Sequence, residues 1–174
     1  MRAWHPDLRV WGRSATLGNL DEARETLLGS SFPGSAMISA DLNKELVIET
    51  LIPDEIARFP WAGHLGTRLV EPVAKAIESA DTTLLFTNTR SQTELWFQEL
   101  LEARPAWKDD LAMHHGSLDR EEREKVEQQL REGSLRCVVC TSSLDLGVDF
   151  SPVDQVIQVG SPKGGARRAQ RAGR

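Results

Sequence analysis

The chain has 174 residues, of which 40% are hydrophobic and 27% are charged, as in a globular domain of ordinary size. No apolar run approaches the roughly 18 residues that span a bilayer, and the N-terminus lacks the apolar core of a signal peptide. We therefore expect a cytoplasmic protein with no membrane partner. The net charge is −5, but residues 161–174 carry five basic and no acidic side chains. An acidic body with one basic edge predicts a local anion site and argues against a polybasic surface.

The leading part of the chain has the pattern of one strand and one helix. Residues 7–11 alternate in hydrophobicity and are an expected strand, which a loop of small residues follows. Asn19 is suited to cap a helix because acidic residues fill the next turn, and Gly29 is suited to end it. Residues 30–40 are rich in Ser, Gly and Pro and read as a linker.

Strand and helix patterns alternate through the rest of the chain. Short apolar strands are expected at residues 45–51, 82–86, 110–113, 135–139 and 153–159. Helices are expected at 65–80, from Ser91 through Leu101, and from Asp119 to 131, with Ser91 and Asp119 as their caps and Gly133 as a stop. This alternation predicts an α/β fold with a parallel sheet and helices on both faces.

Two short patterns raise the question of a metal or redox site. Cys137 and Cys140 form C-x-x-C, which could indicate redox chemistry or half of a zinc site. No second cysteine pair exists, and strand residues three apart point to opposite faces, so we expect reduced, mostly buried thiols. His114 and His115 are adjacent on an extended segment and point apart. We therefore predict no metal site, with one histidine packing in the interior.

Small polar residues collect where the expected strands end. They occupy the loops 14–16, 87–90, 114–117 and 141–149, and the basic cluster follows the last strand on an expected helix. Ligands of parallel α/β sheets bind beyond the carboxyl ends of the strands. The sequence therefore predicts a site that faces phosphates at this edge.

The segments at these loops, taken in order, resemble the motifs of superfamily 2 helicases. They are GRSATLGN, LLFTNTRSQTE, HHGSLDREERE, VVCTSSLDLGVDFSPVDQVIQVGSPKG and AQRAGR. Together with FPWAGHLG they resemble the Lhr-type (large helicase-related) family, in particular its bacterial ligase-associated DEXH-box branch. The resemblance implies that residues 41–174 form a RecA-like helicase C-terminal lobe, incomplete because it stops in motif VI. Residues 1–30 would be the last strand and helix of a first RecA-like lobe, and 31–40 the linker.

Two helicase motifs are absent from the chain. Nothing matches the phosphate loop G-x-x-x-x-G-K-[ST], and Asp54-Glu55 is followed by Ile and Ala instead of completing a DExH box. A helicase needs both motifs to hold the phosphates and Mg²⁺. We therefore expect ATP and Mg²⁺ to be held mainly by a first lobe that is missing here, and the chain alone to be inactive.

The resemblance assigns nucleotide-binding roles to motifs V and VI. Arg174, Arg171 and Gln170 would be the catalytic residues, with Arg174 as an arginine finger at the γ-phosphate, where a guanidinium suits the developing charge. Gly147 and Asp149 would meet the bound nucleotide, since an Asp carboxylate accepts hydrogen bonds from hydroxyls and a Gly permits close approach.

The resemblance also assigns nucleic-acid contacts to motifs IV and V and to the loop between them. The expected residues are Thr87, Asn88, Arg90, His115, Thr141 and Ser142. Their hydroxyl, amide and cationic groups suit the phosphate backbone, which carries no sequence information and so fits a translocating motor. Ser14 and Thr16 of motif III would couple the two lobes.

The sequence thus predicts part of an ATP-dependent DNA helicase or translocase of DNA repair, supplying the second motor lobe. The implied partners are single-stranded or tailed DNA, the first RecA-like lobe of the same polypeptide, and a repair ligase and nuclease. A non-catalytic module that binds nucleic acid or protein is the alternative, which the missing phosphate loop favours for the chain itself. A small-molecule α/β enzyme ranks last, because no nucleophile–base pair or Gly-rich fingerprint is present.

Overall fold

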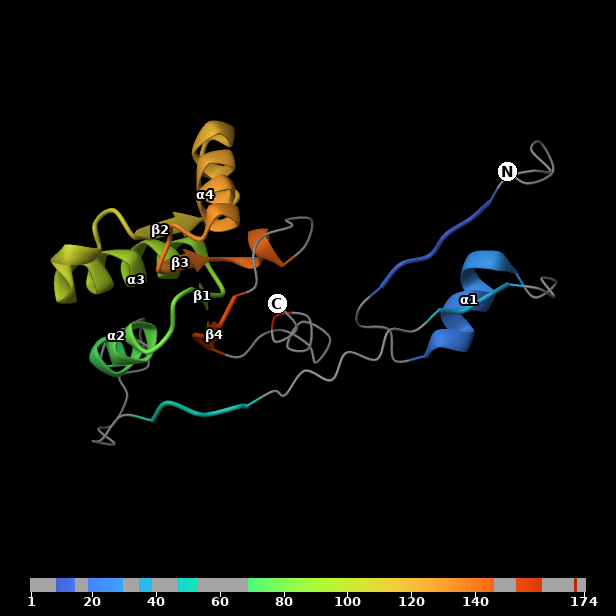
Figure 1. The fold of residues 1–174 in the computed structure, drawn as a ribbon, viewed down its shortest axis with the longest axis horizontal. Helices are drawn as coiled ribbons and strands as arrows, with labels where there is room; N and C mark the ends of the chain where they lie inside the picture. Colours follow the sequence, from blue (N-terminus) through green and yellow to red (C-terminus); the bar gives the residue numbers. More distant parts are fainter. Residues whose placement is uncertain are drawn as a thin grey trace. The chain divides into compact units, whose positions relative to one another are not determined.

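The structure, a computed structural model, describes residues 9–14, 19–29, 35–38, 47–52, 69–145, 153–160 and 171. The chain divides into two compact units, Met1–Leu46 and Val47–Arg174 (Figure 1). The division falls six residues after the expected end of the linker, and the assignment of the leading residues to a first lobe stays a prediction. Within the described ranges, no helix is long and apolar enough to cross a membrane.

The first unit contains the helix α1 (Leu20–Leu28). The side chain of Asn19 accepts a hydrogen bond from the amide of Glu22 at 3.2 Å, and Gly29 ends the helix with a φ of 81°. Both boundaries confirm the prediction from the sequence. The expected strand at 7–11 is not found in its described part, because residues 9–14 carry no strand. A strand requires a partner for its backbone hydrogen bonds, and no described segment pairs with this one.

The second unit is built on a sheet of four parallel strands. They are β1 (Thr83–Phe86), β2 (Leu111–His114), β3 (Cys137–Cys140) and β4 (Gln155–Gln158), in the order β2-β3-β1-β4. The parallel sheet expected from the sequence is therefore confirmed. The strand expected at 45–51 is wrong for its described part, since residues 47–52 carry no strand and leave Val47 and Ile48 exposed.

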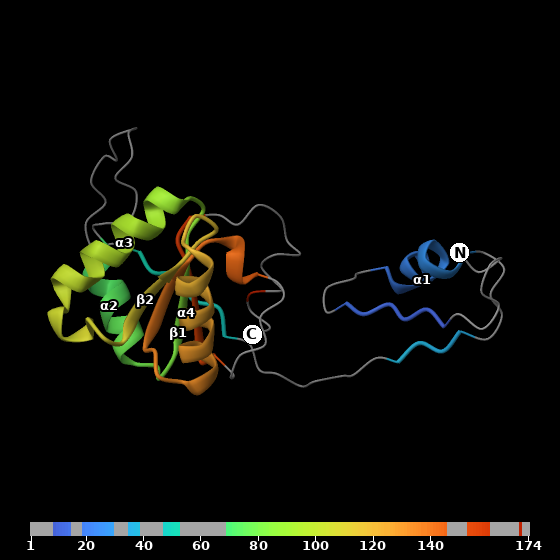
Figure 2. The same cartoon turned by 90° about the horizontal axis from the view of Figure 1, so that it is seen from above.

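In the described part of the second unit, three helices cover the two faces of this sheet. They are α2 (Val70–Glu78), α3 (Arg90–Ala103) and α4 (Arg120–Glu132). Figure 2 shows α2 and α3 on one side of the strands and α4 on the other. Helices on both faces were expected, because strands that alternate with helices form parallel crossover units.

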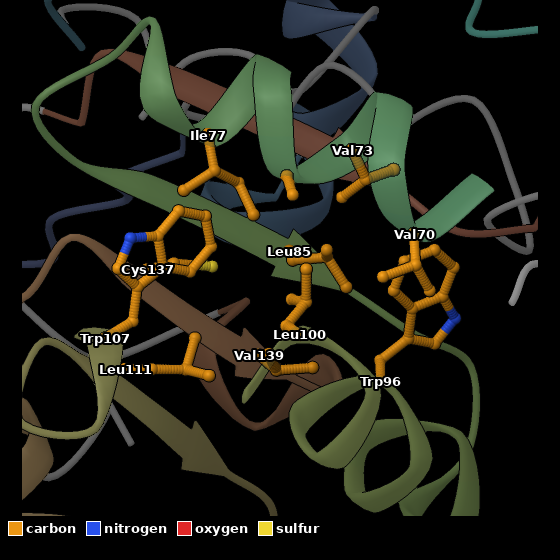
Figure 3. Close-up of a cluster of buried hydrophobic side chains, with 11 residues drawn as sticks. Val70, Val73, Ile77, Leu85, Trp96, Leu100, Trp107, Leu111, Cys137 and Val139 are labelled. Carbon is orange, nitrogen blue, oxygen red and sulfur yellow. The ribbon is translucent and has the colours of Figure 1, made fainter. Parts of the chain in front are cut away.

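The core follows the alternation of side chains along the strands. Leu85 and Val139 point toward α2 and α3, where they pack in a buried cluster with Trp96 and Leu100 (Figure 3). Leu84 and Val138, one residue earlier, lie in a second cluster with Val126 and Leu130 of α4. Because residues i and i+1 of a strand face opposite sides, each strand of this sheet contributes to both clusters.

The two cysteines of β3 also divide between the faces. Cys137 belongs to the cluster under α2 and α3, and Cys140 to the cluster under α4. Both are free thiols, and burial raises the pKa of each well above its ordinary value. The prediction of reduced, buried cysteines on opposite faces is confirmed.

The helix starts differ from the prediction at one position. The cap of α3 is Thr89, whose hydroxyl accepts a hydrogen bond from the amide of Gln92 at 3.3 Å, so the expected cap Ser91 is wrong. Thr89 has the extended backbone that a cap requires, whereas Ser91 already lies in the first turn. Asp119 does precede α4, and Gly133 ends that helix in the left-handed region with a φ of 67°.

Candidate nucleic-acid and nucleotide interface

The carboxyl ends of the four strands meet at one edge of the sheet. Phe86, the last residue of β1, pairs with Cys140 of β3 and Gln158 of β4, and Cys140 pairs in turn with His114 of β2. All strands therefore end at the same level. The loops that leave this edge contain the predicted site residues of motifs IV and V and of the segment between them.

The loop after β1 presents two of its three predicted site residues. Asn88 and Arg90 are exposed, and the amide of Asn88 donates to the Gln92 side chain at 3.2 Å. Thr87 is only 1% exposed. Its hydroxyl lies 2.7 Å from the Thr93 hydroxyl and 3.2 Å from the Thr89 carbonyl. Thr87 therefore ties the loop to α3 and does not turn its hydroxyl outward.

Arg90 connects this loop with the loop after β2. Its guanidinium donates a hydrogen bond to the hydroxyl of Ser117, although β3 separates β1 from β2 in the sheet. Ser117 and the neighbouring Gly116 are exposed. Ser117 was not among the predicted site residues. The signal that could have found it is its place in the same polar loop as the two histidines.

His115 shapes the loop after β2 from inside. It is 3% exposed, and its Nδ1 accepts a hydrogen bond from the amide of Ser117 at 3.3 Å. Its Nε2 lies 3.6 Å from a carboxylate oxygen of Glu94 and has no hydrogen-bond partner in the described part of the chain. The ring is thus placed to fix the position of Ser117, and it does not lie on the surface as a residue lining a nucleic-acid path would.

The loop after β3 begins with a turn held by its own hydroxyl groups. Ser142–Leu144 form a short 3₁₀ helix, η3, for which Thr141 is the cap. The Thr141 hydroxyl donates to the Ser143 hydroxyl at 3.3 Å and accepts from the Ser143 amide at 3.4 Å. Ser142 is exposed and Thr141 is partly buried. The two predicted phosphate ligands of motif V therefore sit on one ordered turn.

His114 lies beneath this turn as the last residue of β2. Its Nδ1 is 2.7 Å from the Ser143 hydroxyl, and its Nε2 is 3.3 Å from a carboxylate oxygen of Glu127 in α4. Burial lowers the pKa of His114, and the Glu127 carboxylate acts in the opposite direction. His114 is the packing histidine that the sequence led us to expect, but His115 is buried as well.

Arg171 is held inside the second unit. It is 5% exposed, and its Nε and Nη2 donate to the two carboxylate oxygens of Asp145 at 2.7 and 3.1 Å. Its Nη1 donates to the side chain of Gln158, and its guanidinium carbon lies 4.1 Å from the centroid of the Phe86 ring. All three guanidinium nitrogens thus have partners within the fold. Arg171 joins motif VI to motif V and to the ends of β1 and β4.

The remaining predicted site residues divide into two groups. Ser14 is an exposed residue of the first unit. The others lie outside the described residues, so their roles stay predictions: Thr16, Gly147, Asp149, Gln170 and Arg174. In the ranges that the structure describes, no group of three or more His, Cys, Asp or Glu residues could hold a metal ion.

Residues 68–174 match the family model of the helicase conserved C-terminal domain. The chain belongs to this family. The ATP-dependent helicase Lhr-Core protein 2 of Thermococcus barophilus is 36% identical over 169 residues, which cover 94% of this chain and 19% of the relative. The Lhr helicase/uracil glycosylase of Escherichia coli is 56% identical over 61 residues, which cover 35% of this chain and 4% of that relative.

A solved structure supports the same assignment. The helicase Lhr of Mycobacterium smegmatis, bound to ssDNA and AMP-PNP, superposes with a TM-score of 0.57 at 37% identity, over 62% of this chain and 14% of that one. The chain therefore contains a helicase C-terminal domain, which is similar to that of Lhr helicases. It spans about a fifth of the length of the first curated relatives that it matches.

Proposed function

We propose that this helicase C-terminal domain is the second motor lobe of an ATP-dependent DNA helicase or translocase. In this role it would bind the phosphate backbone of one DNA strand along the edge formed by Asn88, Arg90, Thr141 and Ser142. The observation that supports the proposal is the common level at which the parallel strands end, since it brings exposed polar groups of separate loops to one edge. The related Mycobacterium smegmatis helicase was solved with ssDNA.

Each group on this edge suits a phosphate. The Arg90 guanidinium supplies positive charge, and its bond to Ser117 holds it across the sheet so that less side-chain freedom is lost on binding. Ser142 offers an exposed hydroxyl on the turn that Thr141 caps. Contacts of this kind position a strand without reading its bases, which is what a translocating motor requires.

The proposed nucleotide contacts lie on motifs V and VI. Gly147 and Asp149 would meet the nucleotide, and Gln170 and Arg174 would reach the triphosphate. ATP and Mg²⁺ would be held mainly by a first RecA-like lobe, and the bound ATP supplies the phosphoryl group whose transfer drives movement. Because Arg171 is engaged with Asp145, we assign it the role of fixing motif VI so that Arg174 can extend from it.

The wider context of the proposal comes from the family. It includes DNA repair in the cytoplasm, a first lobe in the same polypeptide coupled through Ser14 and Thr16, and a repair ligase and nuclease as further partners. The Lhr relatives are named as ATP-dependent helicases, and the Escherichia coli relative also as a uracil glycosylase. These partners are not needed for the contacts proposed at the sheet edge.

Binding to a labelled single-stranded oligonucleotide tests the nucleic-acid part of the proposal. Arg90→Ala should weaken binding to different sequences by a similar factor and reduce the salt slope by about 1, because one phosphate contact is lost. Lys108→Ala is the matched control, since Lys108 is exposed but precedes β2 at the other end of the sheet. Equal effects of the two substitutions would contradict the proposed edge.

Hydrolysis of ATP by the chain joined to a lobe that carries a phosphate loop tests the nucleotide part. Arg174→Ala should lower kcat by about 10³-fold or more, as loss of an arginine finger does, while oligonucleotide binding without nucleotide is retained. A chain that binds no single strand and supports no hydrolysis in this setting would instead be a non-catalytic binding module.

A further inference from the structure

His114 joins three elements of the second unit through one ring. It is the last residue of β2 and is 1% exposed. Its Nε2 meets Glu127 on α4 at 3.3 Å, and its Nδ1 meets the hydroxyl of Ser143 in η3 at 2.7 Å. Neither the strand-binding edge nor the nucleotide contacts proposed above use this residue.

The Ser143 hydroxyl has two possible acceptors for its single hydrogen. It lies 2.7 Å from Nδ1 of His114, 3.0 Å from the His114 carbonyl oxygen and 3.3 Å from the Thr141 hydroxyl that donates to it. A hydroxyl donates one hydrogen and accepts on its lone pairs. The single hydrogen must therefore point either to Nδ1 or to the carbonyl.

In each arrangement the ring N–H groups and the Ser143 hydroxyl all have acceptors. The protonation state of the ring selects between the two arrangements. In the neutral ring, Nε2–H donates to Glu127, so Nδ1 accepts the Ser143 hydrogen. In the protonated ring, Nδ1–H donates to Ser143, whose hydrogen turns to the His114 carbonyl. That carbonyl already accepts from the amide of Thr141 at 3.2 Å, so it has a partner in either case.

The turn that carries the proposed phosphate ligands depends on these bonds. Thr141 is tied to His114 through its amide and to Ser143 through its hydroxyl, and Ser142 lies between them. The position of Ser143 thus bears on the position of the neighbouring Ser142.

We infer that His114 is a positioning residue, which holds the turn 141–143 in one place in both of its protonation states by way of the Ser143 hydroxyl. The value of this for strand binding rests on the proposed function. The charged and titratable groups around the ring are Glu127 and Arg123 on α4 and the adjacent His115, and Arg131 pairs with Glu127 at 3.6 Å. On the side of the turn, Asp145 is paired with Arg171.

The test uses the full chain and a double-mutant cycle. His114→Phe keeps a ring without nitrogens, and Ser143→Ala removes the hydroxyl. Each should weaken binding to an oligothymidylate by about fivefold, and the double variant should lose little more, because residues of one network are not additive. His114→Gln should recover part of the affinity, since an amide can donate and accept. Additive losses, or single losses of less than about twofold, would overturn the inference.

A pH profile and hydrogen exchange separate this inference from the proposed function. In Ser143→Ala, the protonated ring has lost its acceptor at Nδ1, so the titration of the His114 ring, followed by NMR over a pH series, should move to lower pH than in the unchanged chain, and an unmoved titration would contradict the contact. Exchange of the Thr141 amide should accelerate about tenfold in His114→Phe and in Ser143→Ala. If the unchanged chain binds no single strand, the proposed function fails, and the exchange rates and the ring titration decide the positioning role. An unchanged Thr141 rate would refute it. If His114→Phe does not fold, the profile of Ser143→Ala decides.

Discussion

Arg171 and Asp145 form a two-pronged ion pair in the interior of the helicase C-terminal domain. Nε meets Oδ1 at 2.7 Å and Nη2 meets Oδ2 at 3.1 Å, with side chains 5% and 7% exposed. The Phe86 ring covers the guanidinium, and the Gln158 side chain accepts a hydrogen bond from its third nitrogen, Nη1. The pair connects residues 26 positions apart in the chain. It therefore ties motif VI to motif V directly above the sheet.

Removing one partner of this pair should destabilise the fold strongly. Asp145→Asn leaves a buried guanidinium without its counter-charge, and breaking a buried pair in this way costs about 3–5 kcal/mol. Urea unfolding monitored by circular dichroism would report the change in the free energy of unfolding. Arg171→Lys should also be destabilising, because an ammonium cannot make the two-pronged contact.

The control for the ion pair is a substitution of an exposed cation. Lys108→Ala should change the free energy of unfolding little, since surface positions away from such pairs tolerate substitution. A loss in Asp145→Asn no larger than in Lys108→Ala would show that the pair does not stabilise the domain.

His114 should make the stability of the chain depend on pH. Burial lowers its pKa below the ordinary value of 6.5, so the unfolded chain binds a proton more readily than the folded one. This contribution to stability is fully present above about pH 6.5 and is lost as the pH falls through that value toward the folded pKa. The melting temperature should thus fall as the pH is lowered from about 8 to about 5. The melting temperature of His114→Gln should fall less over the same range.

Glu127 allows the direction of this effect to be tested. Its carboxylate raises the pKa of His114, so Glu127→Gln should lower that pKa further and enlarge the loss of stability on acidification. The titration of the His114 ring, followed by NMR, should move to lower pH in the variant. A move to higher pH would contradict the assignment of Glu127 as the group that stabilises the charged ring.

The sheet and its helices could be predicted from the sequence because their signals are local. The apolar run around Val138 and Val139, the capping side chain of Asn19 and the stop at Gly133 all act within a few residues. Even here, Thr89 and Ser91 are both good caps, and only the backbone conformation of Thr89 decides between them.

The partners of the site residues could not be predicted in the same way. Thr87 and Arg171 have side chains that can bind phosphate, and the motif resemblance assigned Thr87 to the nucleic-acid contacts and Arg171 to the catalytic residues. In the fold, the Thr87 hydroxyl is hydrogen-bonded to the Thr93 hydroxyl. The Arg171 guanidinium donates to the side chains of Asp145 and Gln158. Such pairings depend on which loops meet at the sheet edge. Composition and periodicity do not contain that information, so a polar residue near a ligand and a polar residue beneath it look alike in the sequence.

The cysteines of β3 should be unreactive in the native chain. Burial raises the pKa of Cys137 and Cys140, so at about pH 8 little thiolate forms and reagents have no access to the sulfur atoms. Dithionitrobenzoate should label neither thiol until urea is added. Lys125→Cys places a thiol on the exposed face of α4 and should react at once, which controls for the reagent. Rapid labelling of Cys137 or Cys140 in the folded chain would contradict their buried placement.

Gly160 and Gly133 form a matched pair for testing the loop after β4. Both have positive φ, 75° and 67°, so alanine is strained at each by about 1–2 kcal/mol. A Cβ at Gly160 would also lie 3.0 Å from the side-chain nitrogen of Asn88, whereas at Gly133 nothing lies within 4 Å. Gly160→Ala should therefore displace Asn88 and weaken oligonucleotide binding beyond its effect on stability. Gly133→Ala should lower the free energy of unfolding similarly but leave binding unchanged, because it ends α4 at the opposite end of the sheet from the loops after the strands. Equal binding by the two variants would mean that Asn88 takes no part in holding the strand.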